Sequence, residues 1–149
     1  MSEPSAVSVP TKLSKLEALR EAKRKREEVE REAEEDLQVA ELELDATMAA
    51  RYGKRGKRWD IVKTTEGPIA VVRGDSMTIK QLRLGLADVE KDNGDTFPIT
   101  FAFVIQQIVH PSREIAGAWL NEMQGLAVRC QDILIALHRG EDSTQTGKR

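Results

Sequence analysis

A long stretch without glycine or proline is the strongest constraint on the fold of this chain. Residues 12–52 are mainly Ala, Leu, Glu, Lys, Arg and Gln, all of which favour helices. Opposite charges recur four residues apart, as in Glu21 with Lys25 and Glu27 with Arg31, and each such pair stabilises a helix by about 0.2–0.5 kcal/mol. We therefore predict one long charged helix over residues 12–52, with Gly53 as its C-cap.

The apolar residues of this helix gather near its two ends. The first patch holds Leu13, Leu16 and Leu19, and the second holds Leu37, Ala40, Leu44 and Met48. Only Ala22, Val29 and Ala33 lie between them, which is too few for the unbroken heptads of a strong coiled coil. We expect two contact surfaces joined by a solvated middle. Whether the helix pairs with a second copy, packs on its own domain or awaits a partner stays open.

The remaining sequence predicts a small α+β domain that is predominantly helical. Residues 1–11 are expected to form a disordered leader, residues 53–140 a hairpin-plus-helices domain and residues 141–149 a flexible tail. β-branched residues on both sides of the turn at Glu66-Gly67 predict a short β-hairpin with strands at 59–64 and 69–73. A compact bundle of about four helices should follow, with bounds near 75–92, 96–110, 112–125 and 126–140.

Composition restricts the class of protein. The net charge is -2, so no overall basic field demands a nucleic acid partner. The single cysteine, Cys130, cannot form an intrachain disulfide, and the N-terminus lacks the features of a signal peptide. No run approaches the roughly 18 apolar residues of a membrane span. We expect an intracellular protein without membrane contact, or one carried inside a particle assembled within a cell.

The residues that catalysis needs are scarce. His110 and His138 both fall at predicted helix C-termini, where the helix dipole explains a histidine without catalysis. Cys130 lies in an apolar helical run and is expected to be a small buried side chain. No pair of these residues has zinc-ligand spacing. We expect no enzymatic activity, no metal and no cofactor, and we place the aromatic residues in the core: Phe97, Phe101, Phe103 and Trp119.

A short basic loop is the one charge feature that stands out after the helix. It holds Lys54, Arg55, Lys57 and Arg58, with Tyr52 and Trp59 on either side. Cations beside aromatic rings are typical of sites that bind phosphate backbones and stack on bases. The predicted helix is strongly acidic between Glu27 and Asp45, however, so carboxylates are also close at hand. We favour pairing with those carboxylates, and keep a nucleic-acid-associated adaptor as the alternative.

The region from residue 53 to 138 resembles a small protein encoded among the tail genes of tailed bacteriophages. The likeness lies in GKRGKRWDIVKTTEGPIAVVR and in IVHPSREIAGAWLNEMQGLAVRCQDILIAL, with a helix ending at His110-Pro111-Ser112 between them. It is similar to the tail assembly chaperone class, or to a small virion component of that neighbourhood. The charged helix at 12–52 lies outside the likeness.

The resemblance implies a non-enzymatic role in binding other phage structural proteins, of the tail tube or tape measure type. Such a protein would act in the cytoplasm of the host bacterial cell or stay in the virion. Its means would be an apolar groove between helices that receives a partner helix. On this hypothesis the partner contacts are Leu37, Leu44 and Met48, with Trp119 and Met123 as secondary candidates.

Overall fold

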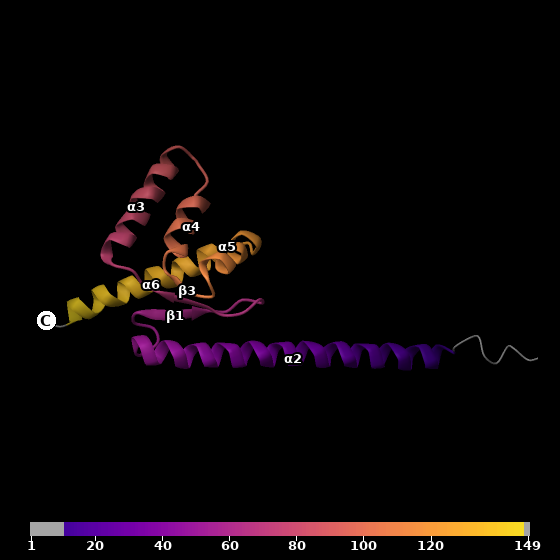
Figure 1. The fold of residues 1–149 in the computed structure, drawn as a ribbon. Helices are drawn as coiled ribbons and strands as arrows, with labels where there is room; N and C mark the ends of the chain where they lie inside the picture. Colours follow the sequence, from indigo (N-terminus) through magenta and orange to yellow (C-terminus); the bar gives the residue numbers. More distant parts are fainter. Residues whose placement is uncertain (1–10, 148–149) are drawn as a thin grey trace, which may run out of the picture. The chain divides into compact units, whose positions relative to one another are not determined.

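The computed structural model describes residues 11–147, and their side chains as far as residue 140 (Figure 1). In these residues helices predominate and a small antiparallel sheet accompanies them, so the predicted α+β class is confirmed. The helices are α2 (Lys12–Tyr52), α3 (Ser76–Lys91), α4 (Phe97–Ile105), α5 (Arg113–Glu122) and α6 (Leu126–Gly147). The strands are β1 (Trp59–Val62), β2 (Ile69–Val72) and β3 (Ile108–His110). Residues 1–10 of the predicted leader and residues 148–149 of the predicted tail lie outside the described residues.

The long helix forms where its composition predicts it. Thr11 caps α2, since its hydroxyl oxygen accepts a hydrogen bond from the Ser14 amide at 3.1 Å. Gly53 ends it with φ +88°, a left-handed conformation that favours glycine, and its amide donates to the Ala49 carbonyl at 2.9 Å. The chain divides into two units at the boundary between Gln38 and Val39, inside α2. The compact unit therefore begins at Val39, where we had expected residue 53.

Strands β1 and β2 form the predicted hairpin, and both of its faces are covered. In the antiparallel register Trp59 lies opposite Val72 and Ile61 opposite Ala70, while Val62 lies opposite Ile69. Side chains alternate between the two faces of a strand. Trp59, Ile61 and Ala70 contact one cluster of apolar residues, whereas Val62, Ile69 and Val71 belong to another. Two covered faces explain why IAVV is apolar at every position.

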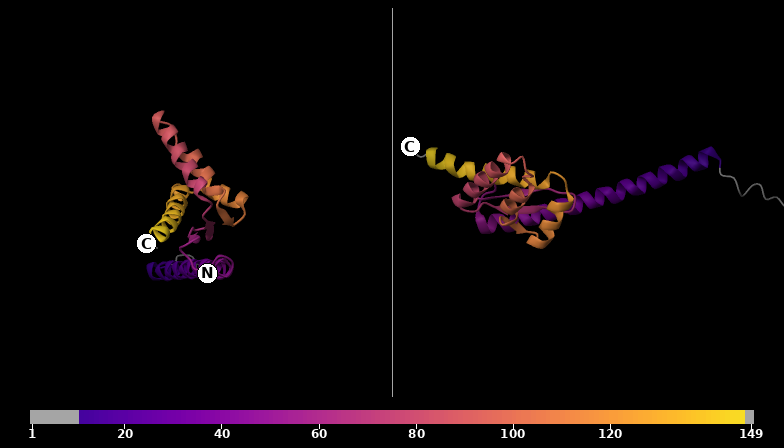
Figure 2. Two further views of the ribbon diagram at one scale, coloured as in Figure 1. Left: turned by 90° about the vertical axis from the view of Figure 1, so that its left-hand side faces the viewer. Right: turned by 90° about the horizontal axis from the view of Figure 1, so that it is seen from above.

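The last turns of α2 cover one face of this hairpin. Leu44 and Met48 are buried against Trp59, Ile61 and Ala70, with Tyr52 half-buried beside them. Figures 1 and 2 show these turns on the opposite side of the sheet from α6. The prediction that Leu44 and Met48 contact a partner is therefore wrong, because the protein's own sheet already buries them. The apolar spacing identified the contact face correctly but not what covers it.

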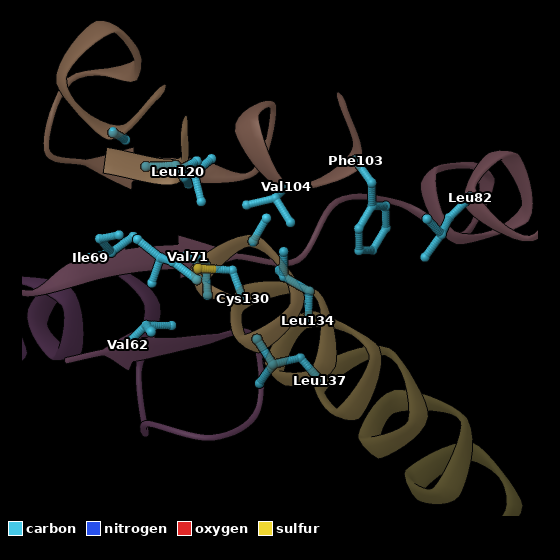
Figure 3. Packing of buried hydrophobic residues seen from close by; sticks show 14 residues of the cluster. Val62, Ile69, Val71, Leu82, Phe103, Val104, Leu120, Cys130, Leu134 and Leu137 are labelled. Carbon is cyan, nitrogen blue, oxygen red and sulfur yellow. The ribbon is translucent and has the colours of Figure 1, made fainter. Parts of the chain in front are cut away.

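The other face of the sheet carries the main core. Val62, Ile69 and Val71 pack against apolar residues of α3–α6, among them Leu82, Phe103, Leu120 and Leu134 (Figure 3). Cys130 is fully buried beside Val71 in this cluster, as predicted (Figure 3). The predicted core aromatics all take part except Phe97, which is exposed: Phe103 is buried, and Phe101 and Trp119 are half-buried.

Local signals place the helix starts. The Asp75 carboxylate caps α3 by accepting from the amides of Met77 and Thr78, and the Ser112 hydroxyl caps α5 by accepting from the Ile115 amide. Thr96 occupies the N-cap position of α4 but makes no side-chain cap. The neighbouring Asp95 carboxylate instead accepts a hydrogen bond from the Phe97 amide at 2.9 Å. Gly85 permits close approach of α3 to α4, because a Cβ there would lie 2.8 Å from Ile99 Cγ2.

Strand β3 was not predicted. We expected a helix up to His110, but α4 ends at Ile105 and residues 108–110 pair antiparallel with β2. Gln107 lies at the junction and is buried. Its side-chain amide donates to the Phe103 carbonyl at 2.8 Å, and its side-chain oxygen accepts from the Gly74 amide at 2.8 Å. His110 therefore belongs to a strand, and the helix-dipole explanation for it was wrong.

The C-terminal helices, α5 and α6, differ in part from what we expected. In α5 the buried residues are Ala116, Gly117 and Leu120, and Ile115 is exposed. Helix α6 does not end at Gly140 but continues to Gly147. His138 is therefore inside the helix, where it is buried with its Nε2 atom 3.3 Å from Gln107 Oε1.

Replacing Leu44 by alanine tests the packing of α2 on the sheet. The Leu44 side chain is 8% exposed, so Leu44→Ala should lower the free energy of unfolding by about 2–4 kcal/mol through lost burial and a residual cavity. Leu42→Ala is the matched control, because Leu42 lies on the same helix and is 70% exposed; we expect a change within about 0.5 kcal/mol. Urea unfolding followed by tryptophan fluorescence measures both. Equal losses would contradict the packing described for α2.

Candidate interaction surfaces

The basic loop between α2 and β1 is tied to carboxylates by one of its four cations. Arg55 Nε lies 2.6 Å from Asp60 Oδ1, and Arg55 Nη1 lies 3.1 Å from Asp45 Oδ2 and 3.6 Å from Glu41 Oε1. Lys63, which directly follows β1, also contacts this group of carboxylates: its Nζ atom lies 3.3 Å from Glu41 Oε2. Arg55 thus joins β1 to the last turns of α2, which is the pairing with the acidic helix that we favoured.

The pKa of Arg55 reflects this arrangement. Burial by itself would lower the pKa, but the hydrogen bonds and negative charges of Asp60 and Asp45 outweigh it and raise the pKa above its usual value. The guanidinium therefore stays in its charged form beside these carboxylates. The sequence suggested the acidic helix as a partner, but it did not identify Glu41, Asp45 and Asp60 as the particular residues.

The other cations of the loop remain at the surface. Lys54, Lys57 and Arg58 are exposed. Arg58 lies over the Tyr52 ring at 5.8 Å from its centroid, and Arg51 lies at 5.3 Å. Trp59, in contrast, is fully buried, and its indole N–H donates to the Gly53 carbonyl at 2.9 Å. The loop therefore offers exposed cations, but Trp59 has no free face on which a base could stack.

The predicted partner contacts are separated by the structure. Leu44 and Met48 are in the core, and Leu37 is half-buried. Trp119 is half-buried against the main core and lies close to the hairpin turn, since a Cβ added at Gly67 would be 3.4 Å from its ring. Met123 lines a shallow depression of about 360 Å³ together with Phe97 and Leu120. Met123 is thus the predicted contact that this depression exposes to a partner.

The exposed apolar residues at the start of α2 were described from the sequence but not chosen as the binding site. Leu13, Leu16 and Leu19 are 64%, 43% and 67% exposed. In the compact unit from Val39 onward, by contrast, many large aliphatic side chains are buried in the core. What distinguishes the N-terminal patch is the high exposure of its three leucines among the described residues, which the sequence alone does not give.

The single cysteine thiol of this protein lies inside the domain. Burial raises the pKa of the Cys130 thiol to about 11, although the charge of Arg129 opposes this shift. Among the residues that the structure describes, no three His, Cys, Asp or Glu side chains are grouped so that they could hold a metal ion. None of the helices in the described chain is long and apolar enough to span a membrane.

Comparison of this chain with known protein families, with curated proteins and with solved structures finds no match. Its function therefore has to be inferred from its own surfaces.

Removing the Arg55 side chain should destabilise the compact unit. Arg55→Ala leaves Asp45, Asp60 and Glu41 close together without their shared cation. We expect the free energy of unfolding to fall by about 1–2 kcal/mol, a small change because these ion pairs are partly exposed. Lys54→Ala, one residue away and exposed, should change stability by less than about 0.5 kcal/mol. Urea titration at low and high salt measures the difference, which should shrink as salt screens the carboxylates. Equal effects of the two substitutions would contradict the assigned role of Arg55.

The Cys130 thiol should not react with thiol reagents in the folded protein. Because its pKa is raised to about 11, the neutral thiol persists at pH 8, and the stability it contributes is present below the usual pKa and lost only as the pH rises toward 11. A thiol-specific chromogenic reagent should label Cys130 at pH 8 only after denaturant is added. Fast labelling without denaturant would show that Cys130 is accessible and contradict its place in the core.

Proposed function

We propose that this protein is a non-enzymatic interaction protein of bacteriophage tail assembly, either an assembly chaperone or a small virion component. The observation that carries the proposal is the exposed patch of Leu13, Leu16 and Leu19 on the first turns of a long helix. Three large aliphatic side chains gain free energy when a partner removes them from water, at about 25 cal/mol per Å² of buried apolar surface.

The geometry of the patch matches a helix-in-groove mode of recognition. Residues three apart on an α-helix lie on neighbouring turns of one side, so the three leucines can enter one apolar groove together. Thr11 caps the helix just before them, which keeps the first turn ordered up to Leu13. The compact unit from Val39 onward would then act as the body that carries this binding helix.

The phage context of the proposal comes from the resemblance of residues 53–138 to small tail-region proteins. The partners it implies are tail tube or tape measure proteins, which present apolar surfaces before they assemble. The site of action would be the cytoplasm of the host bacterium, with retention in the virion if the protein is a structural component. The burial of Cys130 and His138 supports a role without covalent chemistry.

Co-expression with candidate tail proteins tests this proposal. The tagged full chain should retain a tail tube or tape measure protein through affinity purification, and replacing Leu13, Leu16 and Leu19 by serine should reduce the retained amount at least tenfold. The matched control replaces Met77, Leu84 and Val128 by serine; these three are also exposed but lie on other helices, and their replacement should leave retention unchanged. Equal retention by both triple variants, or no retention by the natural chain, would refute the proposal.

A nucleic-acid-associated adaptor is the second candidate, favoured by the exposed cations Lys54, Lys57 and Arg58, of which Arg58 lies over the Tyr52 ring. Changing these three residues to alanine should then abolish binding to single-stranded or duplex nucleic acid at low salt, and binding by the natural chain should fall steeply as salt rises. Arg55 is left in place because its loss would disturb the fold. No retention of nucleic acid at 50 mM salt would remove this candidate.

A further inference from the structure

Charge is divided sharply along the part of α2 that precedes the compact unit. Residues 12–26 contain seven basic and two acidic residues, whereas residues 27–36 contain seven acidic and one basic residue. The basic segment ends in the run Lys23–Arg26, and the acidic segment contains Glu32, Glu34 and Glu35. One continuous helix carries both segments, so their order along the axis is fixed.

An apolar stripe crosses the boundary between these segments. At about 100° per residue, Ala22, Val29 and Ala33 fall within an arc of about 40° on the helix surface. All three are exposed, and Lys25, Arg26 and Glu30 surround Val29 at the middle. The stripe is narrow and its residues are small, which permits close approach of a second helix.

We propose that a second copy of this chain covers the stripe, with the two α2 helices antiparallel and a two-fold axis at Val29. This inference rests on the proposed role of α2 as an interaction element, and it assigns the stretch around Val29 to a second copy. A two-fold interface is self-complementary, so residues equidistant from Val29 on either side meet across it.

That symmetry pairs opposite charges. Lys23–Arg26 of one copy lie opposite residues 32–35 of the other, which are Glu32, Ala33, Glu34 and Glu35. Leu19 lies opposite Val39, which is exposed as well. The parallel arrangement would instead place Lys23–Arg26 against the same four residues of the second copy, where like charges repel. Charge therefore selects the antiparallel orientation, while Val29 against its own copy and Leu19 against Val39 supply the apolar contacts.

Many of these charges lie at the surface of the helix. Lys23 lies 3.9 Å from Glu27 and Arg24 lies 2.6 Å from Glu21, with side chains that remain largely exposed. Since each exposed ion pair is weak in isolation, the proposed dimer depends on several acting together and should weaken with salt.

Light scattering of the full chain tests the subunit count. At low salt and about 100 μM protein, the mass should be twice the 16.7 kDa of one chain, and it should fall toward one chain at about 1 M salt, where screening shortens the reach of charge to about 3 Å. A mass of one chain at low salt overturns the inference. This measurement needs no tail protein, so its failure leaves the co-expression test of the proposed function unaffected.

Exchange of charges tests the pairing itself. One variant replaces Lys23, Arg24, Lys25 and Arg26 by glutamate, and the other replaces Glu32, Glu34 and Glu35 by lysine. Each alone should have the mass of one chain, and an equimolar mixture should regain twice that mass. Circular dichroism checks that each variant keeps its helix. A dimer that persists in both separate variants, or a mixture that stays monomeric while both are helical, overturns the pairing.

Cysteine cross-linking tests the orientation. Val29→Cys should form an intermolecular disulfide under mild oxidation, because the two copies of this residue meet at the axis. Ser14→Cys should not, because the two copies of residue 14 lie at opposite ends of an antiparallel pair. The natural Cys130 is buried and does not interfere. Equal cross-linking by both variants would show a parallel pair and overturn the proposal.

Discussion

Burial of both faces of the β1–β2 hairpin is the constraint on which the compact unit depends. A two-stranded hairpin alone is marginally stable in water, and this one is apolar on both sides. The last turns of α2 cover Trp59, Ile61 and Ala70, and α3–α6 cover Val62, Ile69 and Val71. Neither layer is dispensable, because removing either would expose one apolar face of the sheet. The division of the chain within α2 follows from this, since the helix belongs to the core only from Val39 onward.

Arg55 reinforces the same arrangement with charge. Its guanidinium contacts Asp60 on β1 and Asp45 on α2, so the side chain connects the strand to the helix that covers it. The indole N–H of Trp59 makes a second connection, to the carbonyl of Gly53 where α2 ends. Arg55, one of the four cations of the basic loop, thus has a structural role. The exposed cations around it, Lys54, Lys57 and Arg58, are the ones left for other partners.

Residue propensities and capping residues predicted most helices and strands. The features that they did not predict depend on contacts between residues far apart in the sequence. The long helix, the hairpin and the Ser112 cap follow from propensity, β-branching and capping chemistry that lie within a few residues. Strand β3 was missed because it continues the apolar run that begins at Phe97, and periodicity cannot separate so short a strand from the end of a helix. The fate of Leu44 and Met48 was missed for another reason. Their spacing shows that one helix side is apolar, but whether the covering surface is the same chain or a partner depends on residues up to 26 positions away, such as Ala70.

Gln107 has a consequence for how the compact unit opens. Its side chain bonds to the backbone at Phe103 in α4 and at Gly74, which lies before α3, and it contacts His138 in α6. Its own backbone carbonyl accepts from Val72 at the end of β2. One amide side chain therefore holds the ends of several elements in a water-poor position, where a broken hydrogen bond is expensive. Fraying of the three-residue strand β3 would break these bonds together, so the shortest element of the sheet should separate only when the whole domain melts.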